Sequence, residues 1–109
     1  MKFGLKDEII EQVNCIFAKY PQIEGAIIYG SRAKGNYKTG SDIDLTLMGQ
    51  DLTLSILYAV ELEIDDLLLP YTFDICLFNQ ISNLDLIAHI NRVGLVFYNS
   101  RDKIAGGWL

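Results

Sequence analysis

The sequence predicts an α+β fold, a two-layer α/β arrangement in which a small mixed β-sheet carries helices on one face. Two observations support this prediction. Apolar residues recur at helical spacing in three long segments, and short apolar runs typical of strands separate those segments. Hydrophobic residues make up 50% of the chain, enough for one core, and we expect residues 1–109 to form a single domain.

The first helix is predicted from Lys6 to about Lys19, because apolar residues follow a helical period until Pro21 ends the segment. Cys15 lies beside this apolar stripe, and we expect it to pack against the core. The run from Glu24 to Tyr29 is apolar and rich in isoleucine, which predicts the first strand.

After a polar loop, Asp42 to Met48 is predicted to be the second strand, and Thr53 to about Leu68 the second helix. The helix is expected to be capped by Thr53 or Asp51. Its mostly apolar stripe is expected to consist of Leu54, Leu57, Tyr58, Glu61, Ile64 and Leu68. Its acidic side chains Glu61, Glu63, Asp65 and Asp66 are typical of a solvated side.

The third strand is predicted from Tyr71 to Phe78, and the third helix from Ser82 to about Arg92. The apolar residues of that helix that we expect to face inward are Leu84, Ile87, Ala88 and Ile90. A lone histidine such as His89 is more typical of a surface position than of a ligand or base. Leu95 to Tyr98 is predicted to be the fourth strand. Residues 99–109 are expected to be a frayed tail, with a docking peptide as the alternative.

The charge balance and the cysteine count exclude several classes of protein. A net charge of −5 argues against a broad nucleic-acid-binding face, so we expect no direct nucleic-acid partner. No apolar run approaches the ~20 residues of a membrane span, and the N-terminal segment lacks the apolar core of a signal peptide. Two cysteines are too few for a disulfide framework or a zinc site. We therefore expect a cytoplasmic protein with no membrane partner.

The segment from Tyr29 to Leu45 connects the first two predicted strands and carries the most informative motif. It begins with Gly30-Ser31 and ends with Asp42-Ile43-Asp44. Side chains alternate along a strand, so Asp42 and Asp44 are expected on one face, within roughly 7 Å of each other. Two like charges this close favour a hard divalent cation between them, and Mg²⁺ bound by carboxylates and substrate phosphates is the natural partner.

The beginning of the same segment offers groups that suit a phosphate. Gly30 permits a close backbone approach or a positive φ angle, and Ser31 adds a hydroxyl to an anion-binding turn. Arg32 and Lys34 place positive charge beside that turn. Each half of the motif is common by itself, whereas the two halves flanked by strands predict a nucleotide site.

Asp74 is a further carboxylate in the middle of an apolar strand, where an acid is costly unless it is paired or binds a metal. If the third strand lies next to the second, Asp74 joins Asp42 and Asp44 on one patch. The alternative is a solvated sheet face on which Asp74 has no role. Three convergent carboxylates would suit two-metal phosphoryl chemistry, with Asp74 near the incoming nucleophile as its proton acceptor. The residues alone do not separate hydrolysis from transfer.

Gly30-Ser31, ten intervening residues and Asp42-Ile43-Asp44 resemble the signature of the DNA polymerase β-like nucleotidyltransferase superfamily. The resemblance covers roughly residues 25–98. The short length is similar to that of the minimal nucleotidyltransferase (MNT) group, the MntA-like antitoxins of MNT–HEPN toxin–antitoxin modules.

The resemblance implies ATP as substrate, two Mg²⁺ ions and transfer of AMP to a tyrosine of a partner HEPN-domain toxin. It implies nucleotide binding by Gly30 and Ser31 and metal binding by Asp42, Asp44 and Asp74. It also implies a catalytic role for Arg32. Many relatives have arginine where this chain has Lys34, which keeps the charge but loses the bidentate geometry.

Three readings of the function stay open at this stage. The first is a protein adenylyltransferase, since so short a chain leaves little room for an acceptor pocket. The second is a catalytically weak nucleotide-binding module that neutralises its partner by binding alone. The third is a small-molecule nucleotidyltransferase of the aminoglycoside-modifying type, in which a homo-oligomer would supply the missing wall. The nucleotide, the acceptor and the oligomeric state also stay open.

Overall fold

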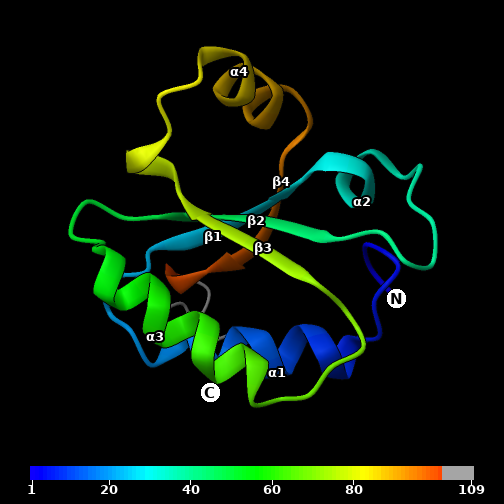
Figure 1. Cartoon of the computed structure of the whole chain (residues 1–109), viewed down its shortest axis with the longest axis horizontal. Helices are drawn as coiled ribbons and strands as arrows, with labels where there is room; N and C mark the ends of the chain where they lie inside the picture. The colour runs from blue at the N-terminus through cyan, green and yellow to red at the C-terminus, as the bar shows by residue number, and fades with distance from the viewer. Residues whose placement is uncertain (102–109) are drawn as a thin grey trace.

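The computed structural model describes residues 1–101 of the chain, and a four-stranded mixed sheet organises them. The strands lie in the order β3-β2-β1-β4 (Figure 1). Their bounds are β1 Gly25–Tyr29, β2 Ile43–Met48, β3 Phe73–Leu77 and β4 Leu95–Asn99. Strand β1 is antiparallel to both β2 and β4, whereas β2 and β3 are parallel. The helix between β2 and β3 supplies the crossover that a parallel pair needs.

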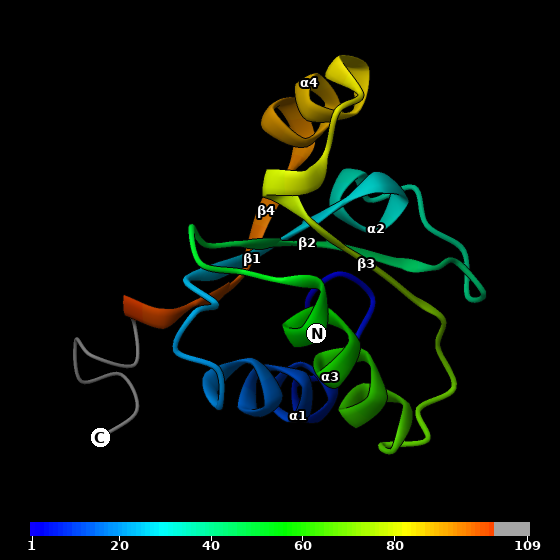
Figure 2. The ribbon, with the colours of Figure 1, turned by 60° about the vertical axis from the view of Figure 1, so that its left-hand side comes forward.

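Two long helices cover one face of this sheet and enclose the core. They are α1, Asp7–Ala18, and α3, Leu54–Asp65, which lie side by side beneath the strands (Figure 2). The fully buried apolar side chains of β2 alternate along the strand and face these helices: Ile43, Leu45 and Leu47. They pack with Phe17 of α1 and Val60 of α3 in one hydrophobic cluster.

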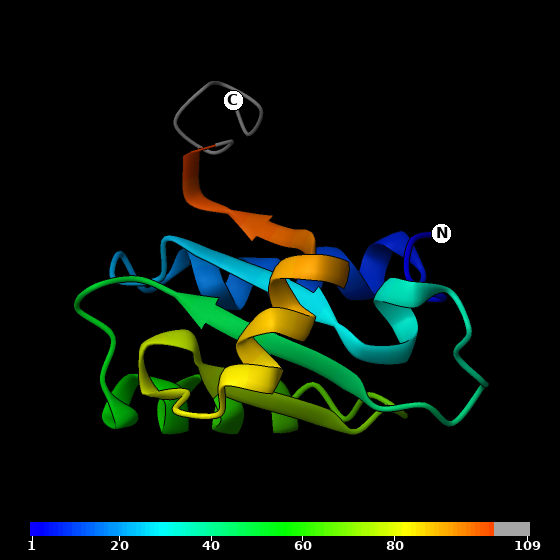
Figure 3. The same ribbon diagram turned by 90° about the horizontal axis from the view of Figure 1, so that it is seen from above.

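The opposite face of the sheet carries the remaining helices. The helix α4, Leu84–Val93, lies across the strands on this side, together with the short helix α2, Gly30–Lys34, and the 3₁₀ turn η1, Phe78–Gln80 (Figure 3). The predicted α+β class and mixed sheet are confirmed, while the position of α4 differs from the expectation that all helices share one face. The reason is local, because α4 buries little more than Ile90 and needs only a small apolar patch beside β1.

The apolar faces of α3 and α4 differ from the predicted ones. In α3 the buried residues are Leu57, Val60 and Ile64, and the helix is rotated so that Val60 faces the sheet where Glu61 was expected. Consequently Leu54 and Tyr58 are 50% and 61% exposed. Leu68 lies beyond the end of α3 and is exposed. In α4, Leu84 is exposed, and so is Ala88.

Three smaller predictions concern Cys15, the cap of α3 and the C-terminal tail. Cys15 is exposed on the outer side of α1, so its predicted packing was wrong. Thr53 caps α3, and its side chain accepts a hydrogen bond from the Ile56 N–H. Asn99 belongs to β4, and the Ser100 N–H donates to the Glu24 carbonyl oxygen (3.1 Å), so the chain is held in place there. The rest of the predicted frayed tail, residues 102–109, lies outside the described residues.

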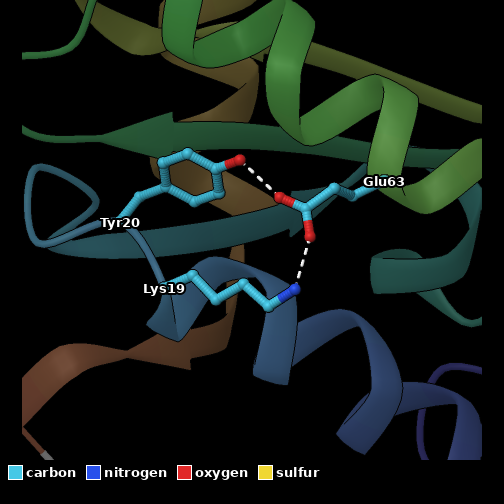
Figure 4. Close-up of polar contacts among 3 residues, drawn as sticks. All are labelled: Lys19, Tyr20 and Glu63. Carbon is cyan, nitrogen blue, oxygen red and sulfur yellow. Dashed lines mark hydrogen bonds and ion pairs between the residues drawn. The ribbon is translucent and has the colours of Figure 1, made fainter.

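A polar contact ties α1 to α3 at the edge of the core. Glu63 accepts a hydrogen bond from the Tyr20 hydroxyl and forms an ion pair with Lys19 (2.6 Å; Figure 4). The hydrogen bonds from Lys19 and Tyr20 lower the pKa of the Glu63 carboxyl. Glu63 is therefore a bridge between the helices as well as part of the acidic side of α3. Within residues 1–101, no helix has the length and apolar character to cross a membrane.

Candidate functional site

The acidic residues predicted to act together meet on the sheet face that α1 and α3 leave open. Asp44 of β2 is the direct register partner of Asp74 in the parallel strand β3. Paired residues of neighbouring strands project from the same face, opposite the buried row that includes Ile43 and Leu45. Asp42 lies two residues before Asp44, at the entrance to β2, and strand alternation gives it the same side. The predicted proximity of the second and third strands is confirmed.

The electrostatics of Asp44 show that these carboxylates affect one another. Partial burial raises the pKa of Asp44, and the negative charges of Asp74 and Asp42 raise it further. The nearby imidazole of His89 acts in the opposite direction. Asp42 and Asp74 are exposed, whereas Asp44 is partly buried between them and the sheet. A cation on this patch would relieve the repulsion that burdens Asp44.

The carboxylates of Asp42, Asp44 and Asp74 suit a hard cation whose remaining ligands are water and substrate phosphates. In residues 1–101, no three side chains of His, Cys, Asp or Glu are arranged to hold a metal ion by themselves. Mg²⁺ does not require such a cage, because one or two carboxylates, water and substrate phosphates commonly complete its octahedral shell. The oxygen chemistry of Asp42, Asp44 and Asp74 suits Mg²⁺, and an incoming triphosphate would supply the missing ligands.

The turn after β1 lies directly against this acidic patch. Gly30 has φ of +71°, a conformation that side chains disfavour, and a Cβ atom at this position would collide with Oδ2 of Asp44. The register explains the contact, because Tyr29 at the end of β1 is paired with Asp44. The short helix α2 then carries Ser31 and ends at Gly35, whose N–H donates to the Ser31 carbonyl oxygen (2.9 Å). The two halves of the sequence motif are therefore adjacent in space.

Arg32 of α2 is buried and bonded to backbone carbonyl groups. Its side chain is only 3% exposed and points away from solvent. Nε and Nη2 donate to the Ser41 carbonyl oxygen (3.1 and 3.0 Å), and Nη1 donates to the Phe3 carbonyl oxygen (2.9 Å). These contacts hold the guanidinium against backbone carbonyl groups, and a catalytic role of Arg32 stays a prediction. The guanidinium instead connects α2 to the residue before Asp42 and to the N-terminal segment.

Two aromatic rings complete the surroundings of Arg32. Its guanidinium carbon lies 5.2 Å from the ring centroid of Tyr37 and 5.3 Å from that of Tyr71. Tyr37 packs against this cation and is 38% exposed. Lys34, the other basic residue of α2, is exposed. Lys34 is therefore a basic side chain of the motif that can approach an anion from solvent.

His89 is the site residue that the sequence analysis missed. Its Nε2 accepts a hydrogen bond from the Gly30 N–H (3.3 Å), and its ring meets the Tyr29 ring edge-on with centroids 6.1 Å apart. The Tyr29 hydroxyl in turn lies 3.6 Å from Sγ of Cys76, and burial raises its pKa. No local pattern marks His89, because its importance depends on α4 lying over the acidic face, which the sequence did not predict.

Comparisons with known proteins show which family this chain belongs to. Residues 11–103 match the family model described as polymerase beta, nucleotidyltransferase. Among curated proteins, no sequence is significantly similar to this chain.

Three solved structures share the fold at low sequence identity. A toxin–antitoxin complex with AMP-PNP has a chain that is 16% identical, with a TM-score of 0.67 and coverage of 91% of this chain and 77% of that one. A mutant MntA–HpeT toxin–antitoxin pair has a chain that is 14% identical, with a TM-score of 0.66 and coverage of 91% of this chain and 77% of that one. A Shewanella oneidensis complex of tri-AMPylated HEPN toxin with MNT antitoxin has a chain that is 12% identical. Its TM-score is 0.65, and the match covers 93% of this chain and 78% of that one.

The family model covers residues 11–103, which is most of the chain. The chain belongs to the polymerase β nucleotidyltransferase family.

Proposed function

We propose that this protein is a Mg²⁺-dependent nucleotidyltransferase that transfers AMP from ATP to a hydroxyl group, namely a tyrosine of a HEPN-domain toxin that it neutralises as an antitoxin. The observation that carries the proposal is the pairing of Asp44 with Asp74 on an open sheet face, with the Gly30 turn against Asp44. Membership of the nucleotidyltransferase family supports the reaction class.

Each residue of the site has a role in this proposal. Asp42, Asp44 and Asp74 hold two Mg²⁺ ions, which when bound neutralise phosphate charge and polarise the reacting phosphoryl group. Gly30 and Ser31 hold the triphosphate through the backbone N–H groups and the hydroxyl of the turn. Exposed Lys34 approaches the outer phosphates as a positive charge.

The proposed reaction is an in-line displacement at the α-phosphorus. The acceptor hydroxyl oxygen forms a bond to the α-phosphorus while the bond from that phosphorus to the bridging oxygen breaks, and pyrophosphate leaves with the bond's electron pair. Asp74 takes the proton of the acceptor hydroxyl, since it is exposed and projects from the same face as Asp44. Arg32 acts at a distance by holding the loop that leads into Asp42.

The partner and the location are also part of the proposal. The structures that share the fold include MNT antitoxin in complex with AMPylated HEPN toxin and a toxin–antitoxin complex with AMP-PNP. They support a protein acceptor and an adenine nucleotide for this chain. ATP and free Mg²⁺ are cytoplasmic reactants, and the free cysteines Cys15 and Cys76 suit the same compartment.

The test is transfer of label from α-labelled ATP to a purified cognate HEPN-domain protein in the presence of Mg²⁺. Wild type should label the partner, and Asp44→Asn should reduce labelling by at least about a hundredfold, the effect of losing a group that stabilises transition-state charge. Asp51→Asn is the matched control, because Asp51 is an exposed aspartate in the loop after β2. Equal labelling by wild type and Asp44→Asn would refute the proposed site.

A second candidate function is neutralisation by binding alone. It is favoured by one observation, that a solved structure sharing the fold is an MNT antitoxin in complex with a HEPN toxin. Mixing the two purified proteins without nucleotide separates the candidates. Full neutralisation of the toxin without ATP, unchanged in Asp44→Asn, would support the binding module over the transferase.

A further inference from the structure

The imidazole of His89 accepts a hydrogen bond from a backbone N–H group of the proposed nucleotide site. The Gly30 N–H donates to Nε2 of His89 at 3.3 Å, although 59 positions separate the two residues in sequence. Gly30 belongs to the turn that lies against Asp44, on the acidic face. A backbone donor of this turn is therefore satisfied by a side chain of α4.

The packing of α4 fixes where this imidazole lies. Ile90, the next residue, is 4% exposed, and Gly94 at the end of the helix packs so closely against Ile27 and the Ile90 carbonyl group that a Cβ atom would not fit. Tyr29 contacts the imidazole ring from the sheet. Because His89 itself is partly exposed, its ring can rotate away from Gly30 without displacing the buried end of the helix.

The chemistry of the contact makes it competitive with an anion. A nitrogen that accepts from an N–H carries no hydrogen, so Nε2 presents a lone pair to Gly30, and a phosphate oxygen would present lone pairs to the same donor. One N–H cannot make a good hydrogen bond to both groups at once. The acceptor that binds must therefore replace the one already there.

We propose that His89 is an internal competitor of the nucleotide triphosphate for the Gly30 N–H, and that nucleotide binding requires the imidazole to leave this donor. The inference rests on the proposed function, since it takes the Gly30 turn to be the phosphate-binding turn. It adds that α4 regulates access to that turn through one side chain.

Removal of the imidazole should strengthen nucleotide binding. A hydrogen bond of this kind contributes a modest net free energy, so we expect the Kd of AMP-PNP with Mg²⁺ to fall about two- to tenfold in His89→Ala and in His89→Phe. Phenylalanine retains a planar ring for the contact with Tyr29 and lacks the acceptor nitrogen. Asn91→Ala is the matched control, because Asn91 is an exposed residue of the same helix and should leave the Kd unchanged.

Calorimetric titration of the full chain with AMP-PNP measures the Kd, and the amide resonance of Gly30 in a proton–nitrogen NMR spectrum reports the hydrogen bond itself. That resonance should shift in His89→Phe without nucleotide, and in wild type on addition of AMP-PNP. Binding that is unchanged or weaker in His89→Phe than in wild type overturns this inference alone. Absence of binding by wild type and both variants overturns the proposed function, on which the inference depends.

Discussion

Replacement of Arg32 should destabilise the fold, because this side chain connects three segments of the molecule. In Arg32→Met, the Ser41 and Phe3 carbonyl groups lose three hydrogen bonds from a guanidinium that is 3% exposed. Each carbonyl left without a partner costs about 1–3 kcal/mol, and each lost contact with an aromatic ring about 0.5–1 kcal/mol. Removing a buried charge offsets part of this sum. We therefore expect the free energy of unfolding to fall by about 3 kcal/mol.

Arg32→Lys separates the charge from the geometry. A lysine ammonium retains the positive charge but lacks the planar fork that serves both carbonyl groups, so we expect a smaller loss of about 1–2 kcal/mol. Lys34→Met is the control, since Lys34 is an exposed basic residue of the same helix and should change stability by no more than about 0.5 kcal/mol.

Urea denaturation measures these losses as shifts of the midpoint at constant slope. Calorimetric titration with AMP-PNP on the same samples tests the alternative role. An Arg32→Met protein that unfolds within about 0.5 kcal/mol of wild type, yet no longer binds AMP-PNP, would refute the positioning role. It would favour the catalytic role of Arg32 that the family resemblance implies.

Three further predictions concern other contacts. Gly30→Ala should cost about 1–2 kcal/mol of stability in denaturant, because of the positive φ angle and the collision with Asp44, whereas Gly40→Ala, with open space around it, should cost much less; equal losses would contradict this reasoning. Asp44→Asn should raise the thermal midpoint at neutral pH in Mg²⁺-free buffer. The raised pKa of Asp44 makes its charge unfavourable there, so the gain should shrink as pH falls through that pKa, and a gain independent of pH would count against it. Glu63→Gln should lower stability at neutral pH. The lowered pKa of Glu63 means that its stabilisation is present above the unfolded-state pKa and disappears as pH falls through the folded-state value, so melting curves of the two proteins should converge in strong acid.

The parts of the fold that follow from periodicity were predictable from the sequence. The order of helices and strands depends on local apolar patterns, and the face shared by Asp44 and Asp74 depends on strand alternation and on one assumed neighbour. The face on which α4 lies was not predictable, because an apolar stripe predicts that a helix packs on the sheet but not on which side, and Ile90 is the one buried residue of α4.

The candidate site likewise has parts that the sequence predicts and parts that depend on tertiary packing. Gly30 lies next to Asp44 because β1 and β2 pair, so that the turn after β1 meets the entrance to β2. Spacing could not reveal that Arg32 turns toward the Phe3 carbonyl oxygen, because that contact depends on where the N-terminal segment packs. The contact of His89 with Gly30 joins residues 59 positions apart in sequence and likewise depends on tertiary structure.

The position of β3 at the edge of the sheet decides how, in the proposed reaction, an acceptor would reach the acids. In the described part of the chain, β3 has a neighbouring strand on one side, and its exposed Asp74 is carried by this outermost strand. The opposite flank of the acids is closed by α4, which packs against β1 and α2. A macromolecule that presents a hydroxyl group would therefore arrive laterally, over β3, and would meet Asp74 before Asp44.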